Sequence, residues 1–233
     1  MDEKKEIISM EKFINNPIAK NFMAIYRTII PFGDLIDTNV NIVINKFMKE
    51  KHELLLNRIL SNTETICTID INDVEFIMNF KKTLDAVNRL SNNDKVIYFA
   101  NLLKNGYLTN NRISNDEYEE YLRILNELSF REINYIFFLY KFELNNNKKD
   151  ENYWYKFMDE FEKEFKINKY KTYEIYKKIS NTGLLYEELQ LEDTSVIEKS
   201  SIEEYDKLIT DTLDLKYFST TNFLNKLIKL IEK

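Results

Sequence analysis

His52 is the only histidine in the chain, so most acid–base and metal chemistry would have to begin there. The pair His52-Glu53 begins like the helical motif of zinc proteases, but Leu56 stands where the second zinc-binding histidine belongs. Cys67 is the only cysteine, which excludes an internal disulfide and a cysteine zinc site. A semi-buried structural thiol is favoured there over a nucleophile, because His52 is its only candidate histidine partner. We expect His52 itself to be an exposed residue on a helix.

Asp70, Asn72 and Asp73 match the opening of a calcium-binding loop. Such a loop needs a glycine at its sixth position and a bidentate glutamate at its end. This chain has no glycine at the first of these places and carries Lys81 at the second. We therefore expect Asn72 or Asp73 to cap a helix instead of binding calcium.

Asp159, Glu164 and Lys166 match the Asp…Glu-x-Lys set of many nucleases. Nucleases normally carry these residues on strands, whereas here all three fall on one predicted helix, so a solvated charged face is favoured. The aromatic stripe over Tyr153–Phe165 has residues that could stack on bases. Its acidic neighbours oppose nucleic acid, and the stripe is better explained as a core or interface face.

Asp34 and Asp37, with Arg27 upstream, form one more set of polar residues that could cluster. Helix capping explains both aspartates without a functional role. We therefore assign no catalytic, cofactor-binding or metal-binding residue, and we expect the protein not to be an enzyme.

The composition is that of a helical protein with a substantial core. The 233 residues are 44% hydrophobic and 14% aromatic, with only 3 glycines and 2 prolines, which argues against glycine-rich phosphate loops. The formal net charge of −6 argues against broad nucleic-acid binding. The start of the chain lacks the apolar region of a secretory signal, and we expect a cytoplasmic protein.

The most regular stretch, residues 94–142, predicts three successive helices around which the rest of the chain packs. The expected boundary signals are Asn93 or Asp94 and Gly106 for the first helix, Ser114 with Glu117 for the second, and Ser129 with Glu132 for the third. The third helix is apolar on nearly all sides, which is typical of a buried core helix.

Helical periodicity also predicts most of the chain before this block. The predicted helices cover residues 6–14, 16–30 with Pro17 at the first position, 34–60 with a solvated middle at 46–53, and 73–90. The residues expected to point inward from the last of these are Val74, Ile77, Met78, Leu84 and Val87. A polar loop is expected over residues 61–72.

After a polar turn at residues 145–150, the chain changes character. We predict helices at 153–165 and 170–180, a glycine stop at Gly183, strands at 184–189 and 215–218, and a last helix capped by Ser219 or Thr220. This order resembles a winged-helix module with an acidic wing, which would support packing or dimerisation more readily than DNA reading. The expected domains are residues 1–145 and 146–233.

Residues 99–105, 116–128 and 129–132 resemble a recurrent arrangement in the Abi-alpha abortive-infection proteins, as do Gly183–Leu185 and the residues after Thr220. The resemblance covers roughly the second half of the chain. It implies a link to phage defence or mobile elements, and no catalytic residue transfers with it.

The sequence thus predicts a mainly α protein, a multi-helix bundle with a small C-terminal winged-helix-like α+β module. The expected function is that of a non-enzymatic interaction protein associated with phage defence, which binds a protein partner or itself. An alternative is a toxic effector that acts on membrane or nucleic acid, with the amphipathic residues 22–47 as the membrane-inserting part. A transcriptional regulator is the third candidate.

Overall fold

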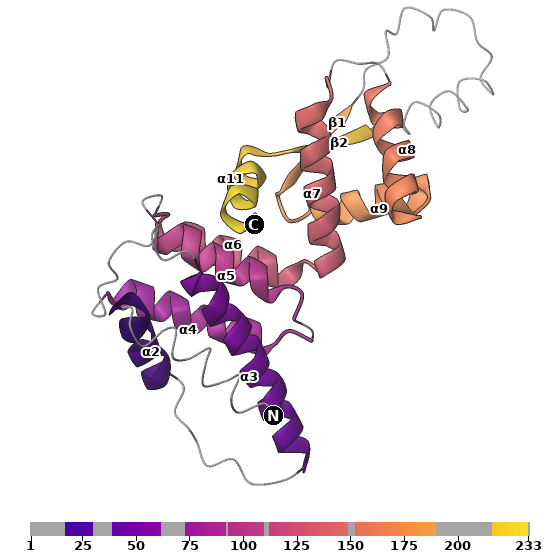
Figure 1. Ribbon diagram of the computed structural model, residues 1–233. Coiled ribbons are helices and arrows are strands. Elements are labelled where there is room, and N and C mark those ends of the chain that lie inside the picture. The colour runs from indigo at the N-terminus through magenta and orange to yellow at the C-terminus, as the bar shows by residue number, and fades with distance from the viewer. Residues whose placement is uncertain are drawn as a thin grey trace, which may run out of the picture. The chain divides into compact units, whose positions relative to one another are not determined.

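The computed structural model describes residues 17–29, 39–61, 73–91, 93–109, 112–148, 152–189 and 216–232 (Figure 1). These parts are mainly helical with one two-stranded sheet, as the sequence predicts. The chain divides into two compact units, Met1–Glu127 with Lys229–Lys233, and Leu128–Ile228. The domain boundary expected at residue 145 falls inside the second unit, at the end of a helix. Cys67 and the helix predicted over residues 6–14 lie outside the described residues.

The first unit contains one central helix, against which three of its other helices pack. Its helices are α2 (Pro17–Ile29), α3 (Asn39–Leu60), α4 (Val74–Asn88), α5 (Val96–Tyr107) and α6 (Asn115–Glu127). The central helix is α5, which contacts α3, α4 and α6 and has Phe99, Leu102 and Leu103 fully buried. Its apolar surface therefore drives the assembly of this unit through the hydrophobic effect.

The boundary signals of this unit were predicted with mixed success. Asp73 caps α4 by accepting a hydrogen bond of 3.1 Å from the backbone N–H of Phe76, as expected. The residue before α5 is Lys95, which makes no side-chain capping bond, so the predicted cap at Asn93 or Asp94 is wrong. Gly106 does not end α5 but lies inside it, where a Cβ atom would come within 3.2 Å of the Ile113 side chain. The glycine therefore permits close approach of the chain that follows.

The inward face of α4 agrees only in part with the predicted one, in which Leu84 and Val87 are buried as expected. Val74 and Met78 are 66% and 53% exposed, whereas Phe76 and Phe80 are buried and their rings stack 6.1 Å apart. Burying two phenylalanines removes more apolar surface from water than burying a valine and a methionine, so α4 packs with Phe76 and Phe80 toward the core.

The second unit contains α7 (Phe130–Asn145), α8 (Tyr153–Phe165), α9 (Lys169–Ser180), β1 (Leu185–Leu189), β2 (Lys216–Thr220) and α11 (Asn222–Ile231), whose residues from Lys229 onward group with the first unit. The predicted capping box at the start of α7 is present, because Ser129 and Glu132 each bond the other's backbone N–H. One side of α7 is buried, but Phe137 and Tyr140 are only half-buried, so α7 is not covered all round as predicted.

Aromatic rings form the core of the second unit. Phe157 of α8 is fully buried, with ring centroids at 4.7 Å from Trp154, 5.3 Å from Phe142 and 5.4 Å from Tyr176. Most of these pairs are edge-to-face or tilted, as the ring quadrupoles favour. The aromatic stripe of residues 153–165 is therefore a core face, one of the two roles expected for it.

The second unit also contains a small sheet, which packs against α7 and α9. β1 and β2 pair antiparallel, with Leu185 opposite Thr220 and Leu189 opposite Lys216. Gly183 precedes β1 with a φ of 79°, a left-handed conformation that glycine adopts without strain. Thr221 caps α11 by accepting from the N–H of Leu224, one residue later than the later of the two predicted caps, Thr220.

No helix within the described ranges combines the length and apolar character needed to cross a bilayer.

Candidate functional site

His52 is buried, not exposed as the sequence suggested, and its side chain is 7% exposed as part of a cluster between three helices. Its Nδ1 lies 2.9 Å from the hydroxyl of Tyr26 on α2, and its Nε2 lies 2.7 Å from Oδ1 of Asn88 on α4. The ring therefore links α2 and α4 to α3. The exposed-residue prediction was wrong because both partners are distant in sequence.

The His52 ring is satisfied as a neutral imidazole. Asn88 Oδ1 can only accept, so Nε2 carries the proton, and the Tyr26 hydroxyl donates to Nδ1. Burial is the main cause that lowers the pKa of His52; the bond to Asn88 opposes it, and the charge of Lys51 adds to it. Burial and Glu53 raise the pKa of the Tyr26 phenol, which keeps its proton. The Tyr26 hydroxyl, the His52 imidazole and the Asn88 amide are thus hydrogen-bonded in a row. The hydroxyl is not an activated nucleophile, because its pKa is raised and not lowered.

We expect this cluster to make the stability of the first unit depend on pH. The pKa of folded His52 lies below the unfolded value, so the unfolded chain binds the proton first as pH falls below about 6.5. Stability is therefore highest above that pH and falls toward pH 5, by about 1.4 kcal/mol for each unit that separates the two pKa values. Urea unfolding at pH 7.5 and 5.5 measures this loss.

The His52→Gln variant is the matched control, since it cannot titrate in this range. We expect it to be less stable than the wild type at pH 7.5 and to lose no further stability between pH 7.5 and 5.5. Equal pH slopes for the two proteins would show that His52 does not set the dependence.

A second polar cluster lies in the interior between α4, α5 and α6. Asn79 donates to the hydroxyl of Tyr107 and to Oδ1 of Asn115, and Thr83 bonds the hydroxyl of Tyr118. Burial raises the pKa of Tyr107 to about 12 and that of Tyr118 further. These phenols stay neutral and fix the register of the three helices, so they are unsuited to proton transfer at neutral pH.

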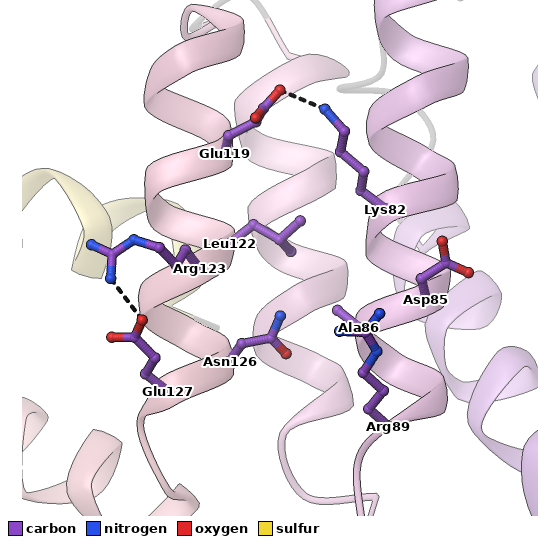
Figure 2. Close-up of a pocket in the computed structure, with 9 residues that line it drawn as sticks. All are labelled: Lys82, Asp85, Ala86, Arg89, Glu119, Leu122, Arg123, Asn126 and Glu127. Atoms are coloured by element: carbon purple, nitrogen blue, oxygen red, sulfur yellow. Dashed lines mark hydrogen bonds and ion pairs between the residues drawn. The ribbon is translucent and has the colours of Figure 1, made fainter.

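A surface groove of about 380 Å³ lies between α4 and α6 (Figure 2). Its lining residues are Lys82, Asp85, Ala86, Arg89, Glu119, Leu122, Arg123, Asn126 and Glu127. Ala86 and Leu122 form an apolar floor, and both are nearly fully buried. We call this feature the α4–α6 groove.

The charged residues of the α4–α6 groove differ in their partners. Lys82 pairs with Glu119 at 2.5 Å, and Arg123 pairs with Glu127 at 2.7 Å. Within the described parts of the chain, the guanidinium of Arg89 has no hydrogen-bond or ion-pair partner. Figure 2 shows the Arg89 side chain running along the groove toward Ala86.

The outer side of α4 extends this groove with apolar residues. Val74, Met78, Lys82, Asp85 and Arg89 follow one another at helical spacing, and we call them the α4 outer stripe. The first two are among the large apolar side chains that stay exposed. The stripe therefore joins an apolar end to a charged, concave end.

The other candidates from the sequence do not converge on a site. Asp159 pairs with Lys169 at 2.8 Å, while Glu164 and Lys166 are exposed, as expected for a solvated face. Asp73 caps α4 and also pairs with Arg112 at 3.0 Å. The remaining ones lie outside the described residues: Asp34, Asp37, Cys67, Asp70, Asn72 and the side chain of Arg27.

Among the residues that the structure describes, no group of three or more His, Cys, Asp or Glu side chains could hold a metal ion. The α4–α6 groove was missed from sequence because its two walls come from helices that α5 separates along the chain. The exposed end of the α4 outer stripe was missed because Val74 and Met78 were predicted to point inward, and the phenylalanines at positions 76 and 80 were the signal that could have corrected this.

Comparison of the chain with protein-family models gives no match, and comparisons with curated proteins and with solved structures give none either.

Proposed function

We propose that this chain is a non-enzymatic interaction protein that binds a protein partner through the α4 outer stripe and the α4–α6 groove. The observation that carries the proposal is the exposure of Val74 and Met78, 66% and 53%, on the side of α4 that leads into the groove. Isolated exposed apolar residues are common, but these two lie one turn apart and continue into a concave surface.

The chemistry of the stripe suits a protein interface. Methionine and arginine are enriched at such interfaces, and methionine adapts its shape to the surface it meets. Covering an exposed apolar side chain of this size contributes about 1.5–3 kcal/mol. The ion pair between Lys82 and Glu119 lies at the edge of the same surface, where charges set orientation more than affinity.

A role in phage defence is part of the proposal, and it rests on the sequence resemblance to the abortive-infection proteins. Such a protein would act by recognising a host or phage protein. The two polar clusters in the first unit favour a recognition role over an enzymatic one, because the polar groups of His52, Asn79 and Tyr118 are already used in hydrogen bonds between helices.

Affinity capture from a host lysate tests the proposal, with the intact chain and its Met78→Asp variant as baits. We expect a partner that the wild type retains and the variant loses, since the aspartate would place a charge in the apolar contact. The control bait is Leu144→Asp, because Leu144 is a comparably exposed apolar residue, 67%, in the second unit. A partner lost equally from both variants, or from neither, would contradict the role of the stripe.

We also propose that the second unit is a winged-helix-like module, in which α7, α8 and α9 precede the β1–β2 hairpin (Figure 1). Packing is the better role for it than DNA reading, because the lysines of α9 have acidic partners. The ion pairs are Lys169–Asp159, Lys171–Glu174, Lys177–Glu187 and Lys178–Glu132. Phosphates would have to compete with each of these carboxylates.

A further inference from the structure

We infer that the α4–α6 groove holds a carboxylate of the protein partner, supplied by an acidic side chain on a helix, with Arg89 as its anchor. This inference rests on the proposed function and adds the chemistry of the partner to it. The observation that carries it is that two side chains with N–H donors and no protein partner among the described residues, Arg89 and Asn126, line the same concave surface with an apolar floor.

Arg89 supplies the charge. Its planar guanidinium presents five N–H donors, and among the described residues none of them meets a carboxylate. The other two cations of the groove, Lys82 and Arg123, are already paired with Glu119 and Glu127. Asp85 lies one turn before Arg89 on α4, but Figure 2 shows its carboxylate turned away from α6.

Asn126 supplies a further donor from the opposite wall. Its side-chain amide points from α6 toward the groove in Figure 2, and within the described parts of the chain the amide makes no hydrogen bond. A carboxylate between the two walls can take two parallel bonds from the guanidinium and one from the amide. Both residues are exposed before binding, so the bound partner is what would desolvate them.

The surroundings select a single carboxylate over a phosphate. Glu119 and Glu127 are paired with Lys82 and Arg123, and Asp85 lines the same groove, so only the Arg89 guanidinium is left to balance an incoming charge and a doubly charged group would exceed it. The floor of Ala86 and Leu122 offers an apolar contact beside the anchor. The fitting occupant is therefore a segment that carries a carboxylate and an apolar side chain on one face.

The direction of the two groove walls fits a helical segment. Lys82 pairs with Glu119 and Thr83 bonds Tyr118, while Asn126 lies opposite Arg89 farther along both helices (Figure 2). The two walls therefore run in the same direction with a furrow between them, and a helix laid in such a furrow contacts it through residues one turn apart. Glutamate and leucine four residues apart satisfy the anchor and the floor together.

The experiment uses two alanine-based helical peptides, which are identical except that one carries glutamate and the other glutamine four residues from a leucine. Fluorescence anisotropy measures the dissociation constant of each for the full chain. We expect the glutamate peptide to bind at least about threefold more tightly, the size of a charge-assisted pair at a solvent-accessible surface. Arg89→Gln should remove this preference. Arg89→Lys should keep only part of it, because a lysine ammonium cannot donate the two parallel hydrogen bonds of a planar guanidinium.

Lys81→Gln is the control, since it removes the same charge from α4 at an exposed residue that does not line the groove. It should leave the glutamate preference intact. The inference is overturned if glutamate gives no preference in the wild type, whether both peptides bind equally or neither binds, or if the preference survives in Arg89→Gln. Such a result leaves the proposed function standing as long as partner capture still depends on Met78.

Discussion

Replacing Phe157 with alanine should lower the free energy of unfolding of the second unit by about 3–5 kcal/mol. The Phe157 side chain is fully buried, and its ring packs against rings from α7, α8 and α9. Alanine would leave a cavity that these stiff neighbours cannot fill by collapsing. Urea denaturation followed by aromatic fluorescence measures the loss, because Trp154 stacks directly on Phe157.

The control for this variant lies on the same helix. Tyr155 is 51% exposed, so Tyr155→Ala should change the stability by no more than about 0.5 kcal/mol. If Phe157→Ala unfolded at the same urea concentration as the control, the second unit would not be held together by its aromatic core.

Replacing Glu143 with alanine should destabilise the same unit by about 2–3 kcal/mol. The Glu143 side chain is 7% exposed and accepts from the backbone N–H of Thr220 at 2.9 Å and from the Thr220 hydroxyl. Lys148 lies 3.1 Å from the same carboxylate and balances its charge. Alanine removes both bonds and leaves the partly buried donors of Thr220 without an acceptor.

Glu143→Gln distinguishes the hydrogen bonds from the charge. Its amide oxygen can still accept from Thr220, so the loss should be roughly half of that in Glu143→Ala, measured by the same unfolding experiment. Since Glu143 connects α7 to the end of β2, the alanine variant should also speed amide exchange in β2. A wild-type stability for Glu143→Ala would mean that the hairpin is held by other contacts.

Local signals in the sequence predicted many of the element boundaries. Pro17 begins α2, Asp73 caps α4, and the Ser129–Glu132 box begins α7, because each of these devices involves residues within one turn of each other. The helix at Tyr153–Phe165 was predicted at its observed bounds for the same reason, since its aromatic stripe repeats at helical spacing.

Features that depend on distant partners were not predicted. His52 is buried because Tyr26 and Asn88, far from it in sequence, satisfy both ring nitrogens. Gly106 looked like a helix end, but the approach of Ile113 explains it better. A single sequence does not show which residues of different helices will contact each other, and such contacts decide which side chains are buried.

The candidate site shows the same limit. The α4–α6 groove lies between two helices that are not adjacent in sequence, and its α4 side is formed by Lys82, Asp85, Ala86 and Arg89. The α4 outer stripe begins with Val74 and Met78 because Phe76 and Phe80 turn inward and leave them outside. Leu84 and Val87 continue the stripe of Phe76 and Phe80, but Val74 and Met78 also stand at helical spacing, so the pattern alone did not decide which of the two pairs is buried. The choice follows from the larger apolar area of the phenylalanine rings and their fit against α5 and α6.

The most direct test of a functional α4 surface is the dissociation constant of the captured partner for the wild-type chain, Met78→Asp and Leu144→Asp. We expect Met78→Asp to weaken binding by about 10- to 100-fold, the loss of one covered apolar side chain of about 1.5–3 kcal/mol. The Leu144→Asp variant should bind within about twofold of the wild type. An unchanged dissociation constant for Met78→Asp would contradict the account.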